Sequence, residues 1–406
     1  MKILYIGQKD IASNGRGVSE NMISALLQKG HEVVLCCADS MYGKTQIVEN
    51  CGVKKVEIKV PNQFGVNIIK KGLILIRLER VMKKAIDKYL SGDEFDLVLY
   101  ATPPITLANV VKHCKKKYGC RSYLMLKDIF PQNAVDLHMM SKRGVTGLLY
   151  KFFRAKETKL YKYSDGIGCM SPANIEYLKA HNEGLEGKRI ELFPNAVQVD
   201  DQVVPKKTSG KDLLLKYGIS TDKLVFIYGG NLGKPQGLDF LAKGIKETCK
   251  NENVYFIIIG KGSEKNKLFE ALNGVENVLT LEALPKEEYE KLCAQCDVGM
   301  VMLDKRFTIP NYPSRMLSYM QNAMPIFACT DKNTDVKQLI EEQAKCGKWC
   351  YSDDIEAFKT CVDWFVENRD KLEKMGENGY FYMTKHFNVE ENVKKLEEFV
   401  SHKEEK

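Results

Sequence analysis

The sequence contains no long hydrophobic run. No apolar stretch approaches the roughly twenty residues that a helix needs to cross a bilayer. The apolar run from Met1 to Gly7 is too short for a secretory signal and ends at a glycine, so it predicts a buried strand. We therefore expect a protein that is neither exported nor membrane-spanning, located in the cytoplasm or peripherally at the inner face of the cell membrane.

The features of a metal centre are also scarce. Only six histidines occur among the 406 residues, and none flanks the pair Cys293-x-x-Cys296, which could otherwise indicate zinc. The thirteen cysteines are scattered through apolar runs, as Cys36 and Cys37 are. This usage is typical of reduced, buried thiols in the cytosol. The sequence has no Asp-x-Asp motif either, so we expect no metal and no cofactor.

The composition excludes a disordered protein. The chain is 44% hydrophobic and 9% aromatic, so it can bury a large core, and its 406 residues exceed what one core usually serves. Two domains are therefore expected. The formal net charge of +8 suits an anionic partner, namely a phosphorylated ligand, an anionic lipid or nucleic acid, without choosing among them.

Short apolar strands alternate with amphipathic helices along the chain, which is typical of parallel sheets covered by helices on both faces. A polar stretch from Pro194 to about Lys211 interrupts the pattern and predicts a linker. We predict an α/β fold of two Rossmann-like, doubly wound domains, residues 1–200 and 205–384, with a terminal helix at about 385–406 that packs back on the first. The predicted strands are 3–6, 33–37, 55–59, 97–100, 121–126, 166–170 and 189–193, then 224–228, 255–259, 278–281, 298–302 and 325–328.

Glycines mark a possible phosphate site in the first half. The loop after the first predicted strand contains Gly15 and Gly17 and opens into a helix. Glycines at a helix start let an anion approach backbone N–H groups, and the helix dipole favours its charge. The dinucleotide-binding fingerprint is not met, because Glu20 stands where its third glycine belongs. The loop is therefore either a ligand contact or a plain turn.

The second half of the sequence also contains glycine-rich turns between a predicted strand and a predicted helix. The strand at 224–228 ends in a glycine-rich turn, Gly229 to Gly237, and the next strand runs into Gly260-Lys261-Gly262. A third turn places Ser314 before Arg315 at a predicted helix start, where the serine can act as N-cap and the arginine as a charged donor. Ligands of parallel sheets bind at the carboxyl ends of strands, so several such turns on one edge predict a diphosphate ligand.

Several short motifs follow one another in a fixed order: Lys2 to Leu4, Gly15 to Gly17, Gly30 to Val33, Pro194 to Ala196, Tyr228 to Gly237, Ile259 to Gly262, Leu281 to Pro285, Asp297 and Val298, and Pro313 to Pro325. Their order and spacing resemble glycosyltransferase family 4, the retaining nucleotide-sugar transferases of GT-B fold, over nearly the full chain. The segment Asp128-Ile129-Phe130-Pro131 looks like the aspartate-x-aromatic-proline signature of the branch that makes bacterial capsule, lipopolysaccharide and exopolysaccharide.

The resemblance implies that the two domains face a cleft, with the acceptor site in the first and the donor site in the second. The base would lie near Leu281 to Leu284 and the diphosphate near Gly230 and Ser314. Asp128 would face the sugar or the acceptor, although by its position it is equally a turn residue that caps its own backbone. The implied donor-binding residues are Gly15, Gly17, Gly230, Asn231, Gln236, Gly260, Gly262, Leu281, Ala283, Ser314 and Ser318.

The chain departs from the family pattern at charged positions. The family's arginine and lysine for the diphosphate fall at Asn231 and Gln236, and its two glutamates fall at a proline and a serine, positions 310 and 318. Lys234 and Arg315 can supply two positive charges instead. We therefore expect Asp128, Lys234 and Arg315 to act in catalysis, with the cations and backbone N–H groups stabilising the departing diphosphate without a metal.

Two basic amphipathic stretches lie in the first half, at 68–90 and 148–163. The second mixes Phe152 and Phe153 with lysines and an arginine. Such helices can rest on anionic lipid, which a lipid-linked acceptor would require, and they are equally explained as core-packing helices with solvated lysines. No recognition module for nucleic acid accompanies them, so we expect no nucleic-acid partner.

The predicted activity is transfer of a hexosyl or N-acetylhexosaminyl group from a nucleoside diphosphate sugar, expected to be a UDP-sugar, to a lipid-linked or polysaccharide acceptor. Retention of configuration is implied by the resemblance alone. Two alternatives stay open: a nucleotide-sugar epimerase of the same fold, and a non-catalytic nucleotide-sugar-binding subunit, which the uncharged residues at 231, 236 and 318 would suit.

Overall fold

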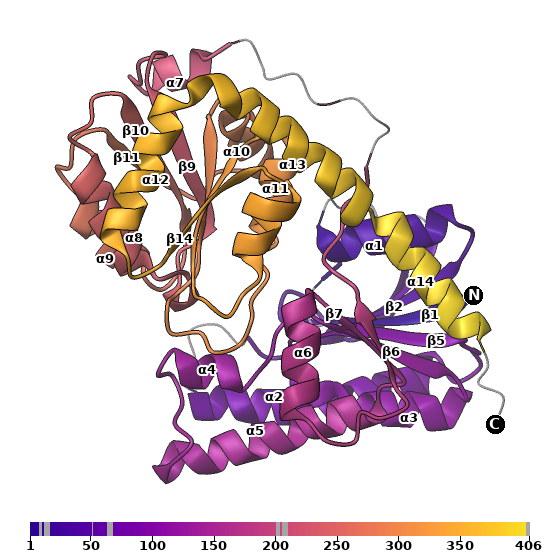
Figure 1. Cartoon of the computed structure of the whole chain (residues 1–406). Helices are drawn as coiled ribbons and strands as arrows, with labels where there is room; N and C mark the ends of the chain where they lie inside the picture. The colour runs from indigo at the N-terminus through magenta and orange to yellow at the C-terminus, as the bar shows by residue number, and fades with distance from the viewer. Residues whose placement is uncertain are drawn as a thin grey trace. The chain divides into compact units, whose positions relative to one another are not determined.

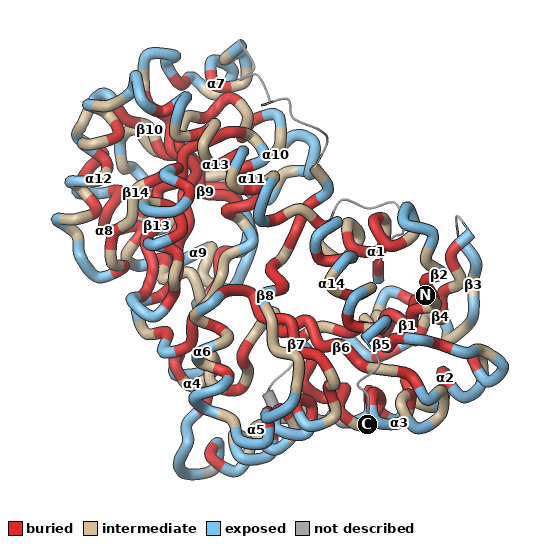
Figure 2. The backbone as a smooth tube through the Cα atoms, turned by 45° about the vertical axis from the view of Figure 1, so that its right-hand side comes forward, coloured by how far each residue is buried: buried red, intermediate tan, exposed pale blue. Residues whose placement is uncertain are grey.

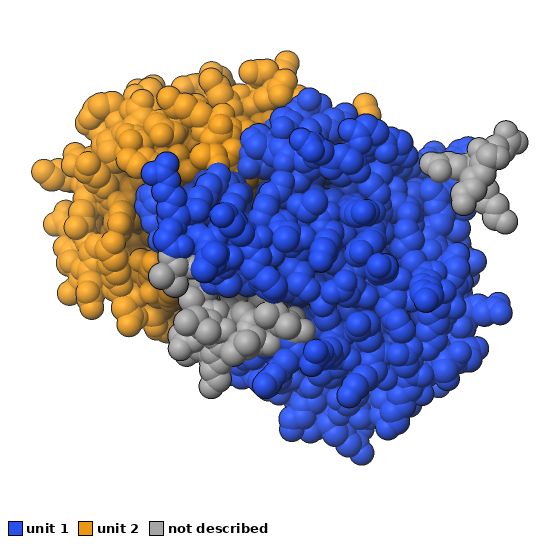
Figure 3. Space-filling view, turned by 90° about the horizontal axis from the view of Figure 1, so that it is seen from below, with its two compact units in different colours: residues 1–199, 387–406 blue, residues 200–386 orange. Residues whose placement is uncertain are grey.

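The computed structural model describes residues 1–7, 10–11, 17–50, 52–62, 68–199, 204 and 210–402. The chain forms two compact units, coloured separately in Figure 3. Unit 1 comprises Met1–Val199 and Phe387–Lys406, and unit 2 comprises Asp200–His386. The chain leaves unit 1 within the polar stretch that the sequence marks as a linker.

Unit 1 is built on an eight-stranded sheet in the order β3-β4-β2-β1-β5-β6-β7-β8. All neighbours are parallel except the edge pair of β3 and β4, which is antiparallel. Strand β3 was not predicted from the sequence, because its residues are half-buried or exposed and form no apolar run. The strands are β1 (Lys2–Gly7), β2 (Glu32–Asp39), β3 (Gln46–Asn50), β4 (Val53–Lys59), β5 (Leu97–Ala101), β6 (Arg121–Leu126), β7 (Gly166–Cys169) and β8 (Arg189–Leu192).

Helices cover both faces of this sheet (Figure 1). Alternate strand residues, such as Ile3 and Tyr5, share a buried cluster with α1 and α14, and the remaining strand residues face the layer of α2, α3 and α5. The last helix, α14, contributes Phe399, whose ring centroid lies 5.2 Å from that of Tyr123. The helices of unit 1 are α1 (Val18–Gln28), α2 (Ile68–Tyr89), η1 (Ile105–Leu107), α3 (Ala108–Tyr118), α4 (Gln132–Asp136), α5 (Gly144–Tyr163), α6 (Pro172–His181) and α14 (Val389–Ser401).

Unit 2 holds a six-stranded, wholly parallel sheet in the order β11-β10-β9-β12-β13-β14. The strand order reverses between β9 and β12, and such a switch point is where open parallel sheets bind ligands. The edge strand β14 was not predicted from the sequence, because Lys348 interrupts its short apolar pattern. The strands are β9 (Leu224–Asn231), β10 (Val254–Lys261), β11 (Val278–Glu282), β12 (Val298–Met302), β13 (Ile326–Thr330) and β14 (Gly347–Tyr351).

An aromatic core holds the helices of unit 2 to its sheet. Phe226 and Phe327 from the strands pack against Phe358 and Phe365 from α12, and all four are fully buried. In Figure 2, where buried residues are red, most of β9 is red. Each such ring contributes roughly 2 to 3 kcal/mol through burial. The helices are α7 (Asp212–Lys216), η2 (Lys234–Gln236), α8 (Leu238–Thr248), α9 (Lys265–Leu272), α10 (Lys286–Cys293), α11 (Arg315–Gln321), η3 (Gln338–Gln343), α12 (Ile355–Glu367), η4 (Arg369–Lys371) and α13 (Leu372–His386).

The cysteines of the described residues form no disulfide bonds. Cys293 and Cys296 are both buried in unit 2, and no group of histidine, cysteine or acidic side chains suited to a metal ion occurs in the part of the chain that the structure describes. Among those same residues, no helix combines the length and the apolar character that crossing a membrane requires.

Candidate functional site

Glycines line the carboxyl edge of the unit 2 sheet. Gly230 on β9 and Gly260 on β10 lie side by side in the parallel register. A Cβ atom on Gly260 would come within 2.0 Å of the Gly230 carbonyl oxygen, and one on Gly262 within 2.2 Å of the Leu232 carbonyl oxygen. A backbone carbonyl cannot move away from an added Cβ atom as the end of a flexible side chain can, so both positions require glycine. The edge therefore presents main chain next to the switch point.

The Arg315 guanidinium lies against this glycine edge. A Cβ atom on Gly230, whose φ is +128°, would come within 2.3 Å of Arg315 Nη2. The guanidinium carbon lies 4.3 Å from the ring centroid of Tyr228. No carboxylate among the described residues pairs with Arg315, whereas Arg306 is held by Asp304 through hydrogen bonds of 2.8 and 2.7 Å. Arg315 thus brings an uncompensated, non-titrating charge to exposed backbone.

Tyrosines that the sequence analysis did not single out support Arg315. Tyr319 on α11 donates its hydroxyl to carbonyl oxygens of β9 and β12, at 3.2 and 3.1 Å, and so ties α11 to the switch point. Tyr289 on α10 packs against Gly229, where a Cβ atom would lie 2.2 Å from its Cε2. Burial raises the pKa of both tyrosines well above the usual value, so both hydroxyls stay protonated. No sequence spacing connects α10 with α11, which is why the cluster was missed.

Asn231 and Gln236 close the turn that follows β9. Asn231 Nδ2 donates to Gln236 Oε1 at 3.1 Å, and the same oxygen accepts a hydrogen bond of 3.1 Å from the Gly233 N–H. These two uncharged residues therefore fix the shape of the turn. Lys234 lies between them, is exposed, and has no carboxylate partner among the described residues.

The other predicted donor residues of unit 2 lie at the same edge or on α11. Leu281 lies on β11 beside β10, and exposed Ala283 follows that strand, so both belong to the carboxyl edge. Ser314 is the N-cap residue of α11, as predicted, but its side chain accepts no hydrogen bond from a backbone N–H of that helix. The Ser314 backbone is already helical there, which takes its hydroxyl away from the N–H groups. Ser318 lies one turn further along α11 and is half-buried.

In unit 1, Asp128 follows β6, and Thr102 fixes its backbone. Thr102 Oγ1 accepts a hydrogen bond from the Asp128 N–H at 3.1 Å and donates to the Asp128 carbonyl oxygen at 3.0 Å. The carboxylate makes no hydrogen bond or ion pair with described residues, so they do not support the turn-capping alternative. Burial raises the pKa of Asp128 to about 6. Asp128 is thus a half-buried acid that titrates near neutrality.

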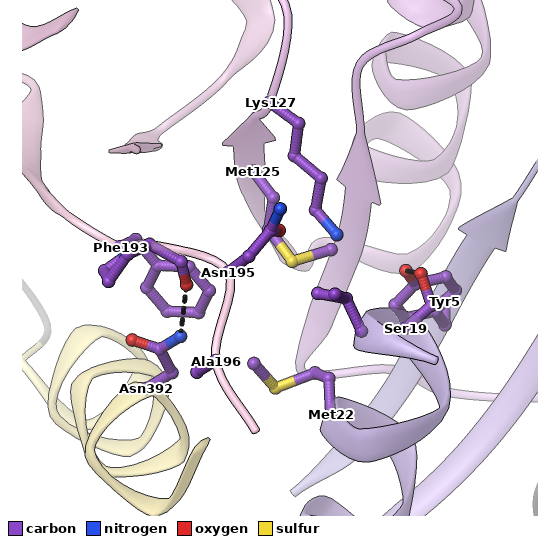
Figure 4. Close-up of a pocket in the computed structure, with 11 residues that line it drawn as sticks. Tyr5, Ser19, Met22, Met125, Lys127, Phe193, Asn195, Ala196 and Asn392 are labelled. Atoms are coloured by element: carbon purple, nitrogen blue, oxygen red, sulfur yellow. Dashed lines mark hydrogen bonds between the residues drawn. The ribbon is translucent and has the colours of Figure 1, made fainter. Parts of the chain in front are cut away.

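Lys127 lines a small pocket of about 10 Å³ in unit 1, together with Ser19 and Asn195 (Figure 4). Burial lowers the pKa of Lys127 to about 8, against an opposing effect of Glu20. Asn195 Oδ1 is buried and finds no hydrogen-bond partner among the described residues. The pocket has room for about one water molecule, so it is too small for a sugar.

The carboxylate of Glu20 lies at the amino end of α1. A Cβ atom on Gly17 would come within 2.1 Å of Glu20 Oε2, so the Glu20 side chain folds back against the first turn. A carboxylate at this place already interacts with the helix dipole and opposes a second anion. Gly15, the other predicted contact of this loop, lies outside the described residues. The ligand role of Gly17 stays a prediction.

The fold, and the glycine edge with its cation, are typical of α/β proteins that bind nucleotides. Residues 212–381 match the family described as "Glycosyl transferases group 1". This match falls within unit 2 and includes every predicted site residue of that unit, so unit 2 is similar to a group 1 glycosyltransferase domain.

Three similar proteins are named as glycosyltransferases. The chain is 24% identical over 274 residues to the glycosyltransferase WbjE of Pseudomonas aeruginosa, across 67% of this chain and 66% of WbjE. It is 21% identical over 364 residues to WcaI of Escherichia coli, whose name assigns it to colanic acid biosynthesis, across 84% and 86% of the two chains. It is 32% identical over 149 residues to the glycosyltransferase MJ1059 of Methanocaldococcus jannaschii, across 36% and 34%.

Solved structures confirm the predicted fold class of two Rossmann-like parallel-sheet domains. Sucrose-phosphate synthase from Thermosynechococcus elongatus superposes with a TM-score of 0.76 over 98% of both chains, at 12% identity. The Escherichia coli trehalose-6-phosphate structure bound with UDP-2-fluoro glucose gives 0.72 over 99% of both chains, at 10% identity.

Proposed function

We propose that this chain is a retaining glycosyltransferase that moves a hexosyl or N-acetylhexosaminyl group from a UDP-sugar to a lipid-linked or polysaccharide acceptor in cell-surface polysaccharide biosynthesis. The unpaired Arg315 against the glycine edge of β9 and β10 carries the proposal. Exposed main chain and a fixed cation are what a diphosphate requires. The name of WcaI supports the polysaccharide, and the UDP-2-fluoro glucose in a similar structure supports the donor.

The proposed chemistry breaks the bond between the anomeric carbon and the diphosphate oxygen. The diphosphate leaves with the bonding electrons, while the oxygen of the acceptor hydroxyl forms the new glycosidic bond and its proton passes to the Asp128 carboxylate. Arg315 and Lys234 stabilise the charge that develops on the departing diphosphate, and Asp128 faces the sugar or the acceptor hydroxyl. Because protein cations serve the diphosphate, we expect EDTA to leave the transfer rate unchanged, and a loss of rate restored by Mg²⁺ would contradict this.

Calorimetry with UDP, GDP and ADP tests the donor site. We expect heat of association with UDP, and the absence of heat with all three diphosphates would reject the proposal. A thermal-shift screen of UDP-sugars then identifies the sugar, because a ligand that binds only the native state raises the melting temperature.

Acceptor dependence separates the proposed transferase from its two alternatives. A transferase releases UDP only when a lipid-linked oligosaccharide extract is added. An epimerase would interconvert UDP-sugars without the extract, and a non-catalytic binding subunit would release no UDP under either condition.

A further inference from the structure

The helices on one face of the unit 1 sheet, α2, α3 and α5, are strongly basic. Their described side chains include fourteen lysines and arginines and three carboxylates, a net charge of +11 where the whole chain has +8. The helices on the opposite face, α1 and α14, carry two lysines and five glutamates. The basic charge of this protein is therefore concentrated on one side of one sheet, which we call the basic layer, made of α2, α3 and α5.

The three helices of the basic layer form one surface. Glu79 on α2 accepts hydrogen bonds from Asn109 on α3 at 2.7 Å and from Lys156 on α5 at 2.9 Å, so a single buried carboxylate joins all three. The other two acids of the layer, Asp87 and Glu157, are also ion-paired within it. Figure 1 shows α2, α3 and α5 running side by side beneath the sheet.

Most cations of the basic layer have no carboxylate to neutralise them. Ten of the fourteen pair with no acid among the described residues. These ten are Arg77, Arg80, Lys83, Lys84, Lys88, Lys112, Lys116, Lys151, Lys159 and Lys162. An exposed array of this kind attracts a polyanion or an anionic surface.

Apolar side chains on α5 distinguish between those two partners. Leu148 is 72% exposed and Phe152 is 36% exposed, and they are four residues apart on one face of the helix. The exposed stripe continues through Lys151, Lys159 and Lys162 and contains no acid, since Glu157 is buried. Met139, in the loop before α5, is 50% exposed. Nucleic acid phosphates offer nothing to leucine and phenylalanine, whereas the boundary between headgroups and acyl chains takes both apolar and basic groups.

We infer that the basic layer docks on an anionic lipid bilayer, with Leu148 and Phe152 inserted at the headgroup boundary and the unpaired lysines over the headgroups. This deepens the proposed function, because it would bring the chain to a lipid-linked acceptor. The docking surface itself lies in unit 1, whereas the proposed donor site lies in unit 2.

Vesicle flotation tests this surface on the full chain. The test compares vesicles of pure phosphatidylcholine with vesicles that contain about 30% phosphatidylglycerol, which have a strongly anionic surface. We expect binding only to the anionic vesicles and release by high salt, since screening weakens this attraction. Equal binding to neutral vesicles, or no binding to either kind, would overturn the inference.

Charge reversal locates the surface. The triple variant Lys151→Glu, Lys159→Glu, Lys162→Glu should bind anionic vesicles on the order of 100-fold more weakly, at about fivefold per lysine removed. The matched control, Lys243→Glu, Lys246→Glu, Lys250→Glu, changes exposed positions on α8 of unit 2 and a position two residues beyond its end. It makes the same change in net charge and should bind as the native chain does. The reverse ranking of the two triple variants would place the lipid contact elsewhere.

A second pair of variants tests the apolar contact. The double variant Leu148→Asn, Phe152→Asn should lose at least tenfold in vesicle affinity, whereas Met41→Asn, at a position 85% exposed, should lose nothing. Binding of duplex DNA at the same salt, unaffected by the double variant and tighter than binding of vesicles, would reassign the layer to nucleic acid and reject the lipid. UDP calorimetry on the same variants should be unchanged, so a failure here is distinct from failure of the donor site.

Discussion

The carboxyl edges of the two sheets differ in the groups that they present. In unit 2 the edge is main chain and one fixed charge, because Gly230 and Gly260 leave no room for side chains and Arg315 does not titrate. In unit 1 the edge carries Lys127 and Asp128, whose pKa values of about 8 and about 6 lie on either side of neutrality.

This difference teaches how one architecture serves two tasks. A backbone edge with a guanidinium holds an anion of constant charge over a wide pH range. An edge that carries groups with shifted pKa values can gain or lose protons near neutral pH, as a general acid or base must. We therefore expect unit 2 to determine the affinity for the donor and unit 1 to determine the pH dependence of the rate.

The largest effect should come from Asp128→Asn, with transfer slowed about 100-fold or more. If the carboxylate form is the active one, the native rate falls as pH drops below about 6, because Asp128 then becomes protonated. The variant should lack this acidic limb in a plot of kcat/KM against pH. A native profile that is flat from pH 5 to pH 8, or a limb that persists in the variant, would remove Asp128 from the reaction.

The same variant should also change stability. Burial raises the pKa of Asp128 in the folded chain above its pKa in the unfolded chain. The contribution of Asp128 to the free energy of unfolding is therefore fully present below about pH 4, where the carboxyl is protonated in both states, and is lost as the pH rises through about 6. At pH 8 the asparagine variant should therefore be more stable by up to about 3 kcal/mol. Urea unfolding at pH 4 and pH 8 measures this, and exposed Asp363→Asn serves as the control.

The next effect belongs to Arg315→Ala, which should weaken UDP binding about 10-fold to 150-fold, the equivalent of roughly 1.5 to 3 kcal/mol for a charged contact. Calorimetry measures it, with Lys250→Ala as a control that removes one charge before the amino end of β10. An unchanged dissociation constant for Arg315→Ala would mean that the diphosphate lies elsewhere.

A smaller effect, on the fold itself, should follow Gly260→Ala. The added methyl group would meet the Gly230 carbonyl oxygen, so the free energy of unfolding should fall by about 1 to 3 kcal/mol. Gly92→Ala, which meets no atom within 4 Å, should unfold as the native chain does. Equal stability of the two variants would show that the edge can relax and that glycine is not required there.

Lys234→Ala should have the smallest effect, a UDP affinity reduced about threefold, because an exposed lysine interacts through water and is screened by salt. The reduction should disappear at high ionic strength, while that of Arg315→Ala persists. A larger loss for Lys234 than for Arg315 would reverse the ranking on which the comparison depends.

The alternation of apolar strands with amphipathic helices was sufficient to predict both sheets, because buried parallel strands are continuous apolar runs. The edge strands β3 and β14 were not predicted, since an edge strand is partly exposed to solvent and its sequence therefore mixes polar and apolar residues. Arg315 beside Gly230 was predicted as part of one edge, and its support by Tyr289 and Tyr319 was not, because the contacts join elements distant in sequence. The Asn231–Gln236 hydrogen bond likewise depends on the shape of the turn, which residue types alone do not specify.

The placement of α14 in unit 1 has a consequence for synthesis on the ribosome. Unit 2 is one continuous segment, whereas unit 1 needs Leu396 and Phe399 to complete its core. Domains fold as units, usually in the order of their emergence, yet here the second unit to begin is the first whose sequence is complete. The nascent amino-terminal half must therefore wait, with part of its apolar surface uncovered, until α14 has emerged behind the whole of unit 2.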